Sequence, residues 1–267
     1  MTLKQQPPCS RLELLAVFIS REIQDGETVG VGRNLSLPLA GALLAQFHHG
    51  PNIRLVFGHV TTNLHHRPAV DFSETDWRRE LQWAESFRPE DQTMISLKHL
   101  KDTVFFISGL QVDRFGNSNL IGVGPDRRRP RFRGPGAIGT TTLTSYTGRY
   151  YLLLSSHEKR VLVEKCDFIS CLGWGNGDPD IRRKLGLPGG GPKYCLTPLG
   201  VLDFEEYSKN LRLKYLHPGV TVEQVRANTG FEMPLANPME TTPEPTEEEL
   251  AILRTRVDPK GFLRGGI

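Results

Sequence analysis

Apolar residues in the N-terminal part of the chain recur with the spacing of an amphipathic helix. One face of the segment 10–24 carries Leu12, Leu15 and Ile19. Ser10 is followed three residues later by Glu13, the two positions of a capping box, and Gly26 follows the end of the segment. These features predict a helix over 10–24.

Helical and strand-like patterns alternate after this helix. A short β-type run at 27–32 precedes a second apolar helix at 38–48. The segment 53–58, IRLVFG, is apolar almost throughout, which is typical of a strand buried on both faces. Such alternation favours a parallel sheet with helices on both of its faces.

The remaining patterns extend this α/β organisation. Further strands are expected at 103–109, 119–124, 151–156, 161–170, 194–197 and 200–204. A turn joins the first two of them, where Asp113 can hydrogen-bond its own backbone and Gly116 and Asn117 accept positive φ. Later segments are predicted as a loop at 173–192, a helix at 221–229 capped by Thr221, a Pro/Glu/Thr linker at 234–245, and a helix at 246–256 with a Thr246–Glu249 capping box.

The domain organisation follows from these patterns. We expect one α/β domain over residues 1–233, because strands and helices alternate throughout it. The segment 234–267, a linker, a helix and a tail, is predicted to be a C-terminal extension that packs on the domain or on a partner.

Composition excludes several classes of protein. The 267 residues carry 24% charged side chains and a net charge of only +3, which argues against a disordered polyelectrolyte and against binding of nucleic acid by the whole surface. No apolar run reaches the roughly 18 residues of a membrane helix, and we find no signal-peptide pattern. The four cysteines, at 9, 166, 171 and 195, are therefore expected to be reduced thiols in a cytoplasmic protein.

A glycine-rich segment, RGPGAIGTTT at 133–142, is the first candidate for chemistry. Gly134, Gly136 and Gly139 open a stretch that could start a helix. Loops of this kind direct backbone N–H groups at an anion or a developing oxyanion. A tight turn without any function explains the same spacing.

An arginine cluster immediately precedes these glycines. Five arginines lie within seven residues: Arg127, Arg128, Arg129, Arg131 and Arg133. Guanidinium groups bind phosphates in a bidentate manner, so a phosphate of coenzyme A or of a nucleotide is one candidate ligand. A solvated or partner-facing loop and a nucleic-acid contact are the alternatives.

Five histidines lie close together in the sequence, at 48, 49, 59, 65 and 66. His59 follows a predicted buried strand, where functional groups of parallel α/β sheets collect, and it is a weak candidate for a general base. No HxH or HxxxH pair and no acidic residue accompanies the group, so we predict no metal site. The whole stretch 28–70 contains neither Asp nor Glu.

Nine ordered sequence blocks resemble one known family. They are GLQVDRFGNSN (109–119), RFRGPGAIG (131–139), HEKR (157–160), DFISCLGW (167–174), RRKLGLPGGGP (182–192), LGVLDF (199–204), HPGVT (217–221), NTGFE (228–232) and VDP (257–259). Together they make the chain similar to the β subunit of family I CoA transferases, of the type found in glutaconate CoA-transferase. The same blocks also resemble the B subunit of the steroid ring-opening CoA hydrolases.

The resemblance implies a fold, a partner and a site. The fold is a Rossmann-like open α/β sheet of the sugar-isomerase/CoA-transferase type. The partner is an α-type subunit of similar fold, with the active site between the two chains. Coenzyme A enters as part of an acyl-CoA substrate, and no permanently bound cofactor is implied. Gly134, Gly136 and Gly139 match the glycine-rich loop beside the thioester.

One departure from the family concerns its nucleophile. Family I transferases use a glutamate at the end of a buried strand, and the matching position here is Gly58. A glycine cannot attack a thioester to form an acyl anhydride. Either the partner supplies the nucleophile, or the reaction is a hydrolysis in which a carboxylate of the partner activates water. A non-catalytic structural subunit is the alternative from another class.

Overall fold

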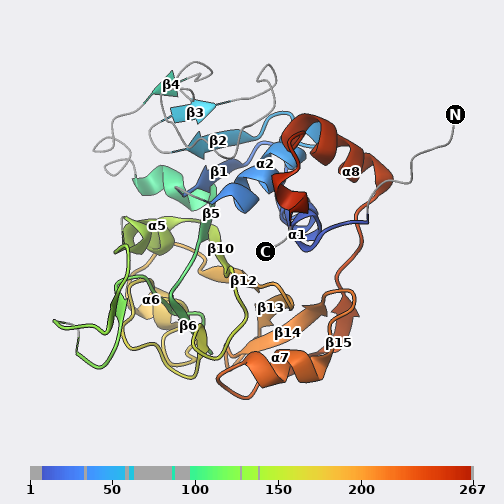
Figure 1. The fold of residues 1–267 in the computed structure, drawn as a ribbon. Coiled ribbons are helices and arrows are strands. Elements are labelled where there is room, and N and C mark those ends of the chain that lie inside the picture. Colours follow the sequence, from blue (N-terminus) through green and yellow to red (C-terminus); the bar gives the residue numbers. More distant parts are fainter. Residues whose placement is uncertain are drawn as a thin grey trace, which may run out of the picture. The chain divides into compact units, whose positions relative to one another are not determined.

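The computed structural model describes residues 8–32, 35–57, 60–62, 86–87, 97–126, 128–137 and 139–265 (Figure 1). They form two compact units. Unit 1 comprises 1–90 and 243–267, and unit 2 comprises 91–242. The boundary that the sequence predicts, between 233 and 234, lies inside unit 2.

Two helices form the core of unit 1: α1 (Arg11–Arg21) and α2 (Ser36–His48). Both predicted helices and the first capping box are confirmed, since the Ser10 hydroxyl accepts the Glu13 N–H at 3.1 Å and the Glu13 carboxylate accepts the Ser10 N–H at 2.9 Å. The helices approach closely at Gly41, where a β-carbon would lie 2.4 Å from the Ile19 side chain. Glycine is required there by packing.

The strands of unit 1 begin parallel and continue antiparallel. They are β1 (Thr28–Val31), β2 (Arg54–Phe57), β3 (Val60–Thr62) and β4 (Ser86–Phe87). β1 and β2 pair in parallel, as predicted for 27–32 and 53–58, whereas β3 pairs antiparallel with β2 and β4 pairs antiparallel with β3.

The C-terminal segment of unit 1 packs on its first helix. It consists of α8 (Glu247–Ile252), the π-helical turn η2 (Leu253–Val257) and the short 3-10 helix η3 (Phe262–Arg264). The predicted Thr246 cap is present. Two bidentate ion pairs hold this segment to α1, between Arg21 and Glu249 and between Arg254 and the buried Glu13, with N–O distances of 2.7–2.9 Å.

Unit 2 is built on a sheet whose order is β15-β14-β13-β12-β10-β5. Its strands are β5 (Thr103–Ile107), β10 (Arg149–Leu153), β12 (Pro192–Leu196), β13 (Gly200–Phe204), β14 (Leu211–Leu216) and β15 (Leu235–Thr241). β5, β10 and β12 are parallel, and β13 and β14 join antiparallel. The predicted α/β fold with an open parallel sheet is confirmed, with antiparallel strands added towards the edges.

Several sequence predictions in unit 2 are wrong. The loop expected at 173–192 contains the short helix α6 (Ile181–Lys184), and the strand expected at 119–124 is replaced by two short strands, β7 (Ser118–Asn119) and β8 (Gly122–Val123). The predicted linker at 234–245 contains β15, which pairs in parallel with β14 as an edge strand, a position where proline is tolerated. The strand expected at 161–170 is limited to β11 (Leu162–Val163). Among non-glycine residues of the described chain only Lys209 has positive φ, so Asn117 does not take the left-handed conformation, whereas Gly116 does, at +71°.

Small elements cover this sheet and connect its strands. They are η1 (Leu97–Asp102), β6 (Gln111–Asp113), β7 (Ser118–Asn119), β8 (Gly122–Val123), β9 (Phe132–Arg133), α5 (Thr140–Tyr146), α6 (Ile181–Lys184) and α7 (Val222–Asn228). β11, β6 and β7 form a small second sheet. The predicted Thr221 cap of α7 is present.

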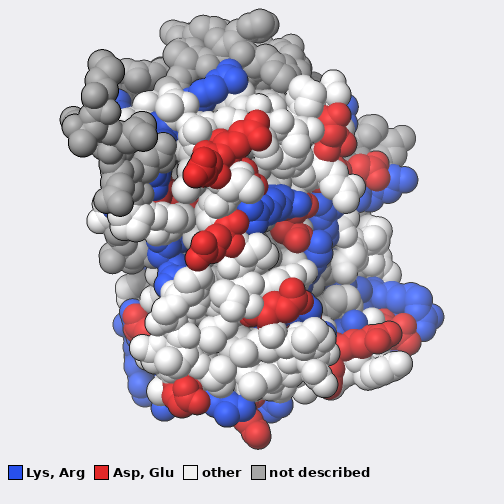
Figure 2. Space-filling view, turned by 90° about the vertical axis from the view of Figure 1, so that its right-hand side faces the viewer, with Lys and Arg blue, Asp and Glu red and all other residues white. Residues whose placement is uncertain are grey.

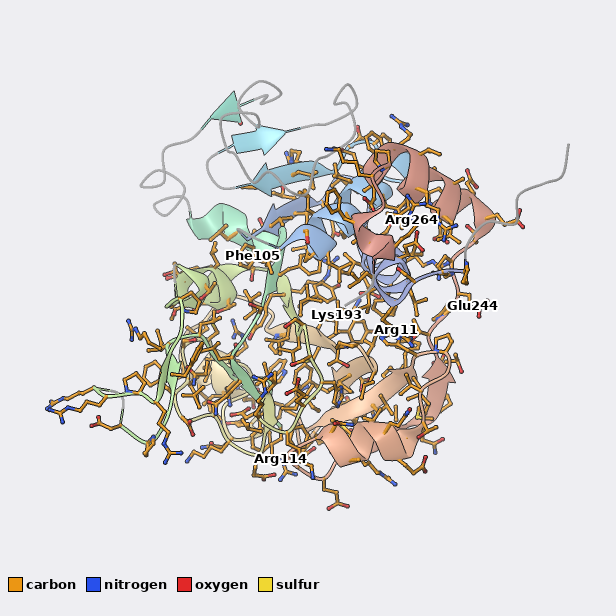
Figure 3. The ribbon with its side chains drawn as sticks, viewed as in Figure 1. Arg11, Phe105, Arg114, Lys193, Glu244 and Arg264 are labelled. Carbon is orange, nitrogen blue, oxygen red and sulfur yellow. The ribbon has the colours of Figure 1, made fainter. Side chains whose placement is uncertain are left out.

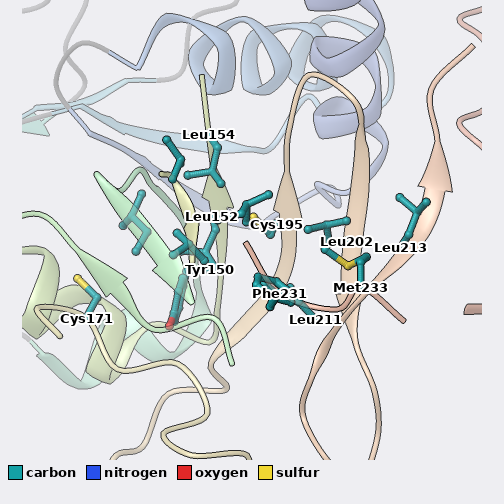
Figure 4. Packing of buried hydrophobic residues seen from close by; sticks show 14 of the residues in the cluster. Tyr150, Leu152, Leu154, Cys171, Cys195, Leu202, Leu211, Leu213, Phe231 and Met233 are labelled. Atoms are coloured by element: carbon teal, nitrogen blue, oxygen red, sulfur yellow. The ribbon is translucent and has the colours of Figure 1, made fainter. Parts of the chain in front are cut away.

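The core of unit 2 gathers apolar side chains from its strands and from the segment that follows α7 (Figure 4). Tyr150, Leu152, Cys195 and Leu213 are fully buried in it, and Met233 contributes from outside the strands. Cys166 and Cys171 are also buried, and burial raises the pKa of all three buried thiols.

The exposed charges do not form a large patch of one sign on the face shown in Figure 2, where acidic and basic side chains alternate. This agrees with the small net charge of +3. Among the described residues, no helix combines the length and apolar character that crossing a bilayer requires.

Candidate functional site

The glycine-rich loop, residues 134–139, leads from the hairpin β8–β9 into helix α5. Gly134 lies directly against the chain before the hairpin, where a β-carbon would stand 2.3 Å from the Leu120 carbonyl oxygen. Its N–H donates to the Ile121 carbonyl oxygen at 2.8 Å. Gly134 is therefore required by a close backbone approach, and its N–H already has an acceptor.

Gly136 is glycine for a different reason. Its φ is +92°, and no described atom lies within 4 Å of the place where a β-carbon would stand. The Gly136 N–H donates to the Leu120 carbonyl oxygen at 3.0 Å. The N–H groups of Gly134 and Gly136 thus both donate to backbone carbonyls of the chain that precedes the hairpin.

Gly139 begins helix α5, which confirms that the glycine-rich segment starts a helix. Gly139 is the N-cap residue with φ +79°, and its carbonyl oxygen accepts the Leu143 N–H at 2.9 Å. Within the described residues, the Gly139 N–H has no acceptor. Of the three predicted loop donors, Gly139 alone keeps an N–H that could serve a ligand.

The start of α5 is fixed by the segment 170–171, which belongs to the DFISCLGW block. The Thr141 hydroxyl donates to the Ser170 carbonyl oxygen at 2.6 Å. The buried Cys171 thiol lies 3.3 Å from the Thr140 hydroxyl oxygen. These contacts anchor the first turn of the helix directly after the glycine-rich loop.

The predicted arginine cluster forms an exposed hairpin (Figures 1 and 3, green, at the left). Strand β9 ends it, with Phe132 opposite Val123 and Arg133 opposite Gly122. The described arginines, all exposed, are Arg128, Arg129, Arg131 and Arg133, whereas Arg127 lies outside the described residues. Within the described part of the chain, none of their guanidinium groups makes a hydrogen bond or an ion pair. Phe132 is 58% exposed.

The turn between β6 and β7 has the structural role that its sequence suggests. The Asp113 carboxylate accepts the N–H groups of Phe115 and Asn117 and the Asn117 side-chain amide, at 2.9–3.1 Å. Asn117 also binds the backbone of Gly173 and Gly175. Burial raises the pKa of the Asp113 carboxyl. The neighbouring Arg114, labelled in Figure 3, pairs with Glu164 at 2.7 Å.

The predicted histidine group is only partly described. His48 lies 3.8 Å from the Glu248 carboxylate, and the His49 ring contacts the Ile23 carbonyl oxygen at 3.0 Å. His59, the candidate base, lies outside the described residues, as do His65 and His66. Among the residues that the structure does describe, no group of three or more His, Cys, Asp or Glu could hold a metal ion.

Two buried histidines that the sequence analysis did not single out meet at Thr197. The His157 ring lies 2.8 Å from the Thr197 hydroxyl and 3.0 Å from the Thr229 hydroxyl. The His217 ring contacts the Thr197 carbonyl oxygen at 2.9 Å and the Thr242 hydroxyl at 2.7 Å. His157 and His217 lie in the blocks HEKR and HPGVT, which carry the family resemblance. Membership of these blocks was the sequence signal that could have pointed to them.

His157 predicts a pH dependence of stability. Burial lowers its pKa from 6.5 to about 4, so between these values the unfolded chain binds a proton that the folded chain does not. The free energy of unfolding should therefore fall by about 1.4 kcal/mol per pH unit on acidification from pH 6.5 towards 4. Urea titrations over this range should show a flatter dependence for His157→Gln than for wild type. If the free energy of unfolding depends on pH equally in both proteins, His157 is not the source of the pH dependence.

The expected position of the nucleophile lies beyond strand β2, which ends at Phe57. Gly58 is outside the described residues. The absence of Asp and Glu from 28–70 is a property of the sequence and holds for any alignment of this strand.

Comparison with known proteins identifies the family. The sequence model of the coenzyme A transferase family matches residues 12–228. The B-type chain of 3-oxoadipate CoA-transferase from Pseudomonas knackmussii is 32% identical over 243 residues, 91% of each chain. The B-type chain of glutaconate CoA-transferase from Acidaminococcus fermentans is 30% identical over 92% of each chain. The IpdB chain of the cholesterol ring-cleaving hydrolase from Mycobacterium tuberculosis is 30% identical over 95% of this chain and 96% of that protein.

Comparison with solved structures leads to the same family and fold. The glutaconate CoA-transferase of Acidaminococcus fermentans superposes with a TM-score of 0.82 at 27% identity, covering 95% of this chain and 96% of that chain. IpdAB of Rhodococcus jostii gives 0.82 at 25% identity, covering 98% and 99%. The decarboxylase AibA/AibB gives 0.81 at 20% identity, covering 97% and 99%, and shares the fold alone. The protein thus has the α/β fold, with a mainly parallel open sheet, of the glutaconate CoA-transferase structure. It belongs to the coenzyme A transferase family and is related both to B-type transferase chains and to IpdB hydrolase chains.

Proposed function

We propose that this chain is the B-type component of a heteromeric enzyme that acts on acyl-CoA thioesters and works with an A-type chain of the same family. The observation that carries the proposal is the similarity to B-type chains over nine-tenths or more of both proteins. Coenzyme A enters as part of the substrate, without a permanently bound cofactor.

The glycine-rich loop is the part of this chain that we assign to the thioester. Among the described residues, no atom fills the space over the Gly136 α-carbon, and none accepts the Gly139 N–H at the start of α5. Gly134 supports the loop through its contact with Leu120. A ligand could therefore approach the backbone closely here, which is what glycines at such positions permit.

The acid-free stretch 28–70 favours a second reaction, in which hydrolysis of a C–C bond opens a ring in a CoA thioester. Transfer through a covalent intermediate requires a carboxylate nucleophile, and this chain offers none in that stretch. In a hydrolase, a carboxylate of the partner would activate water, and this chain would contribute the loop and the pocket wall. The similarity to IpdB supports this alternative.

Reconstitution tests the proposal. The chain should be purified alone and together with an A-type chain of the family, and assayed for CoA transfer to glutaconate or 3-oxoadipate and for hydrolytic ring opening of cyclic acyl-CoA thioesters. We expect activity in the complex and none in either chain alone. Full activity of the A-type chain by itself would favour a purely structural role, and full activity of this chain by itself would refute the requirement for a partner.

The arginine hairpin supports a contact with the phosphate end of coenzyme A, and we assign the 3′-phosphate to it. Its exposed guanidinium groups have no acceptor among the described residues. Arg129 precedes Gly134 by five residues, a span of at most roughly 17 Å of extended chain. That span is comparable with the length of a pantetheine arm, so one substrate could contact both the loop and the hairpin.

Substrate analogues lacking the 3′-phosphate separate this contact from others. Arg129→Gln and Arg131→Gln should each raise KM for the acyl-CoA by roughly two- to fivefold, because exposed ion pairs contribute up to about 1 kcal/mol. KM for the matching 3′-dephospho-CoA thioester should not change. Arg226→Gln, an exposed arginine of α7, is the control. Equal effects on both thioesters would contradict the assignment, and loss of the complex would place the hairpin at the partner instead.

A further inference from the structure

Arg182 is a buried cation without a carboxylate partner. It is 4% exposed and lies in the short helix α6, inside the RRKLGLPGGGP block that the proposed function does not explain. Among the described residues, no Asp or Glu contacts its guanidinium group. Burying an unpaired charge is costly unless its donors are satisfied. In place of a carboxylate, four backbone carbonyl oxygens accept hydrogen bonds from the Arg182 guanidinium group.

Those carbonyls belong largely to the end of α5. The Arg182 guanidinium donates to the Thr144 carbonyl oxygen at 2.6 Å and to the Ser145 carbonyl oxygen at 3.3 Å. Both residues lie in the last turn of the helix, where carbonyls lack partners within the helix. A cation at this end also interacts favourably with the helix dipole.

The same guanidinium group joins two loops to this helix end. It donates to the carbonyl oxygens of Gly189 at 2.9 Å and Leu172 at 3.0 Å. Gly189 in turn donates its N–H to the Ser145 carbonyl oxygen at 2.9 Å. A β-carbon at Gly189 would lie 2.5 Å from the Thr147 carbonyl oxygen, so glycine is needed for this approach.

We propose that Arg182 is a positioning residue for the glycine-rich loop and acts through helix α5. The helix has seven residues and is about 10 Å long, with Gly139 at its first end and Arg182 at its last turn. Its first turn is held by Ser170, so both ends are anchored to other segments of unit 2. Arg182 fixes the axial position of α5 and thereby the placement of Gly139 and Gly136.

The inference rests on the proposed function of the loop, and its test has one arm that does not. Arg182→Met keeps the apolar stem and removes all donors. Arg183→Met, in the same helix, is the control, since Arg183 is exposed and its ion pair among the described residues is with the exposed Asp180. In the assembled complex, Arg182→Met should lower kcat by about 10- to 100-fold and change KM by less than threefold, because a displacement of about 1 Å can cost 10²-fold.

Hydrogen exchange is the second arm. Arg182→Met should increase exchange in peptides covering 134–146 while peptides from β10 keep wild-type protection. Arg182→Lys keeps the positive charge but has one donor nitrogen in place of the three of the guanidinium group. It should give an intermediate result in both arms. Wild-type exchange in 134–146, or raised exchange with unchanged kcat, would overturn the inference.

Failures of the two proposals remain distinguishable. If Arg182→Met does not fold, Arg182→Lys perturbs the same contacts more mildly and is judged by the same two criteria. If the wild-type complex has no activity on acyl-CoA, the proposed function fails, whereas the exchange arm still decides whether Arg182 controls the loop.

Discussion

Gly136→Ala is expected to lower kcat/KM of the assembled complex for an acyl-CoA by about 10²-fold while the chain still folds. A methyl group at this position would occupy the open space through which a thioester could reach the loop backbone. It would also strain a residue whose φ is +92°. A displacement of about 1 Å at the reacting group is enough for an effect of this size.

Gly219→Ala provides a matched control for the strain. Gly219 has φ +76° and likewise no described atom within 4 Å of its absent β-carbon, but it lies in the turn before α7. Both variants should lose about 1–2 kcal/mol of stability from the left-handed conformation, as thermal or urea unfolding will show. If Gly136→Ala is as active as Gly219→Ala, the loop does not contact the thioester, and none of the three glycines Gly134, Gly136 and Gly139 belongs to the site.

Much of the fold could be predicted because its signals are local. The capping boxes at Ser10 and Thr246 involve residues three apart, so they are visible in the sequence and present in the structure. Strands β1, β2 and β5 lie in short, mostly apolar runs, which can be seen locally in the sequence. Strand β14 was missed although Leu211–Leu216, LRLKYL, alternates between apolar and polar positions, because no buried apolar run marks it. β15 was missed because its polar residues and Pro238 are typical of a linker, and only pairing with β14 makes the segment a strand.

The site was less predictable because its determinants are contacts between distant residues. The sequence located the glycines of the loop, but the acceptors of the Gly134 and Gly136 N–H groups are carbonyls more than ten residues away, across the β8–β9 hairpin. Arg182 and Thr144 are 38 residues apart. A run of arginine and lysine in a helix suggests a solvated face, and nothing local indicates that Arg182 turns inward while Arg183 remains exposed.

Covalent trapping is expected to leave this chain unmodified. In a transferase, the nucleophilic carboxylate first forms an acyl anhydride and then a thioester with coenzyme A, which borohydride reduces to an alcohol. The stretch 28–70 contains no carboxylate that could carry this intermediate. The complex should be incubated with acyl-CoA, treated with borohydride and digested, and the peptides of both chains analysed by mass spectrometry. Incubation without acyl-CoA is the control.

The partner chain then separates the two reactions. A reduced glutamate on the partner would indicate a transferase whose nucleophile has moved to the other chain. Two unmodified chains, with ¹⁸O from water incorporated into the product, would indicate hydrolysis, the outcome that the missing carboxylate favours. A reduced residue in this chain, at Glu27, Glu74 or elsewhere, would show that Gly58 does not occupy the position of the nucleophile. The chain would then act as a conventional component of a transferase.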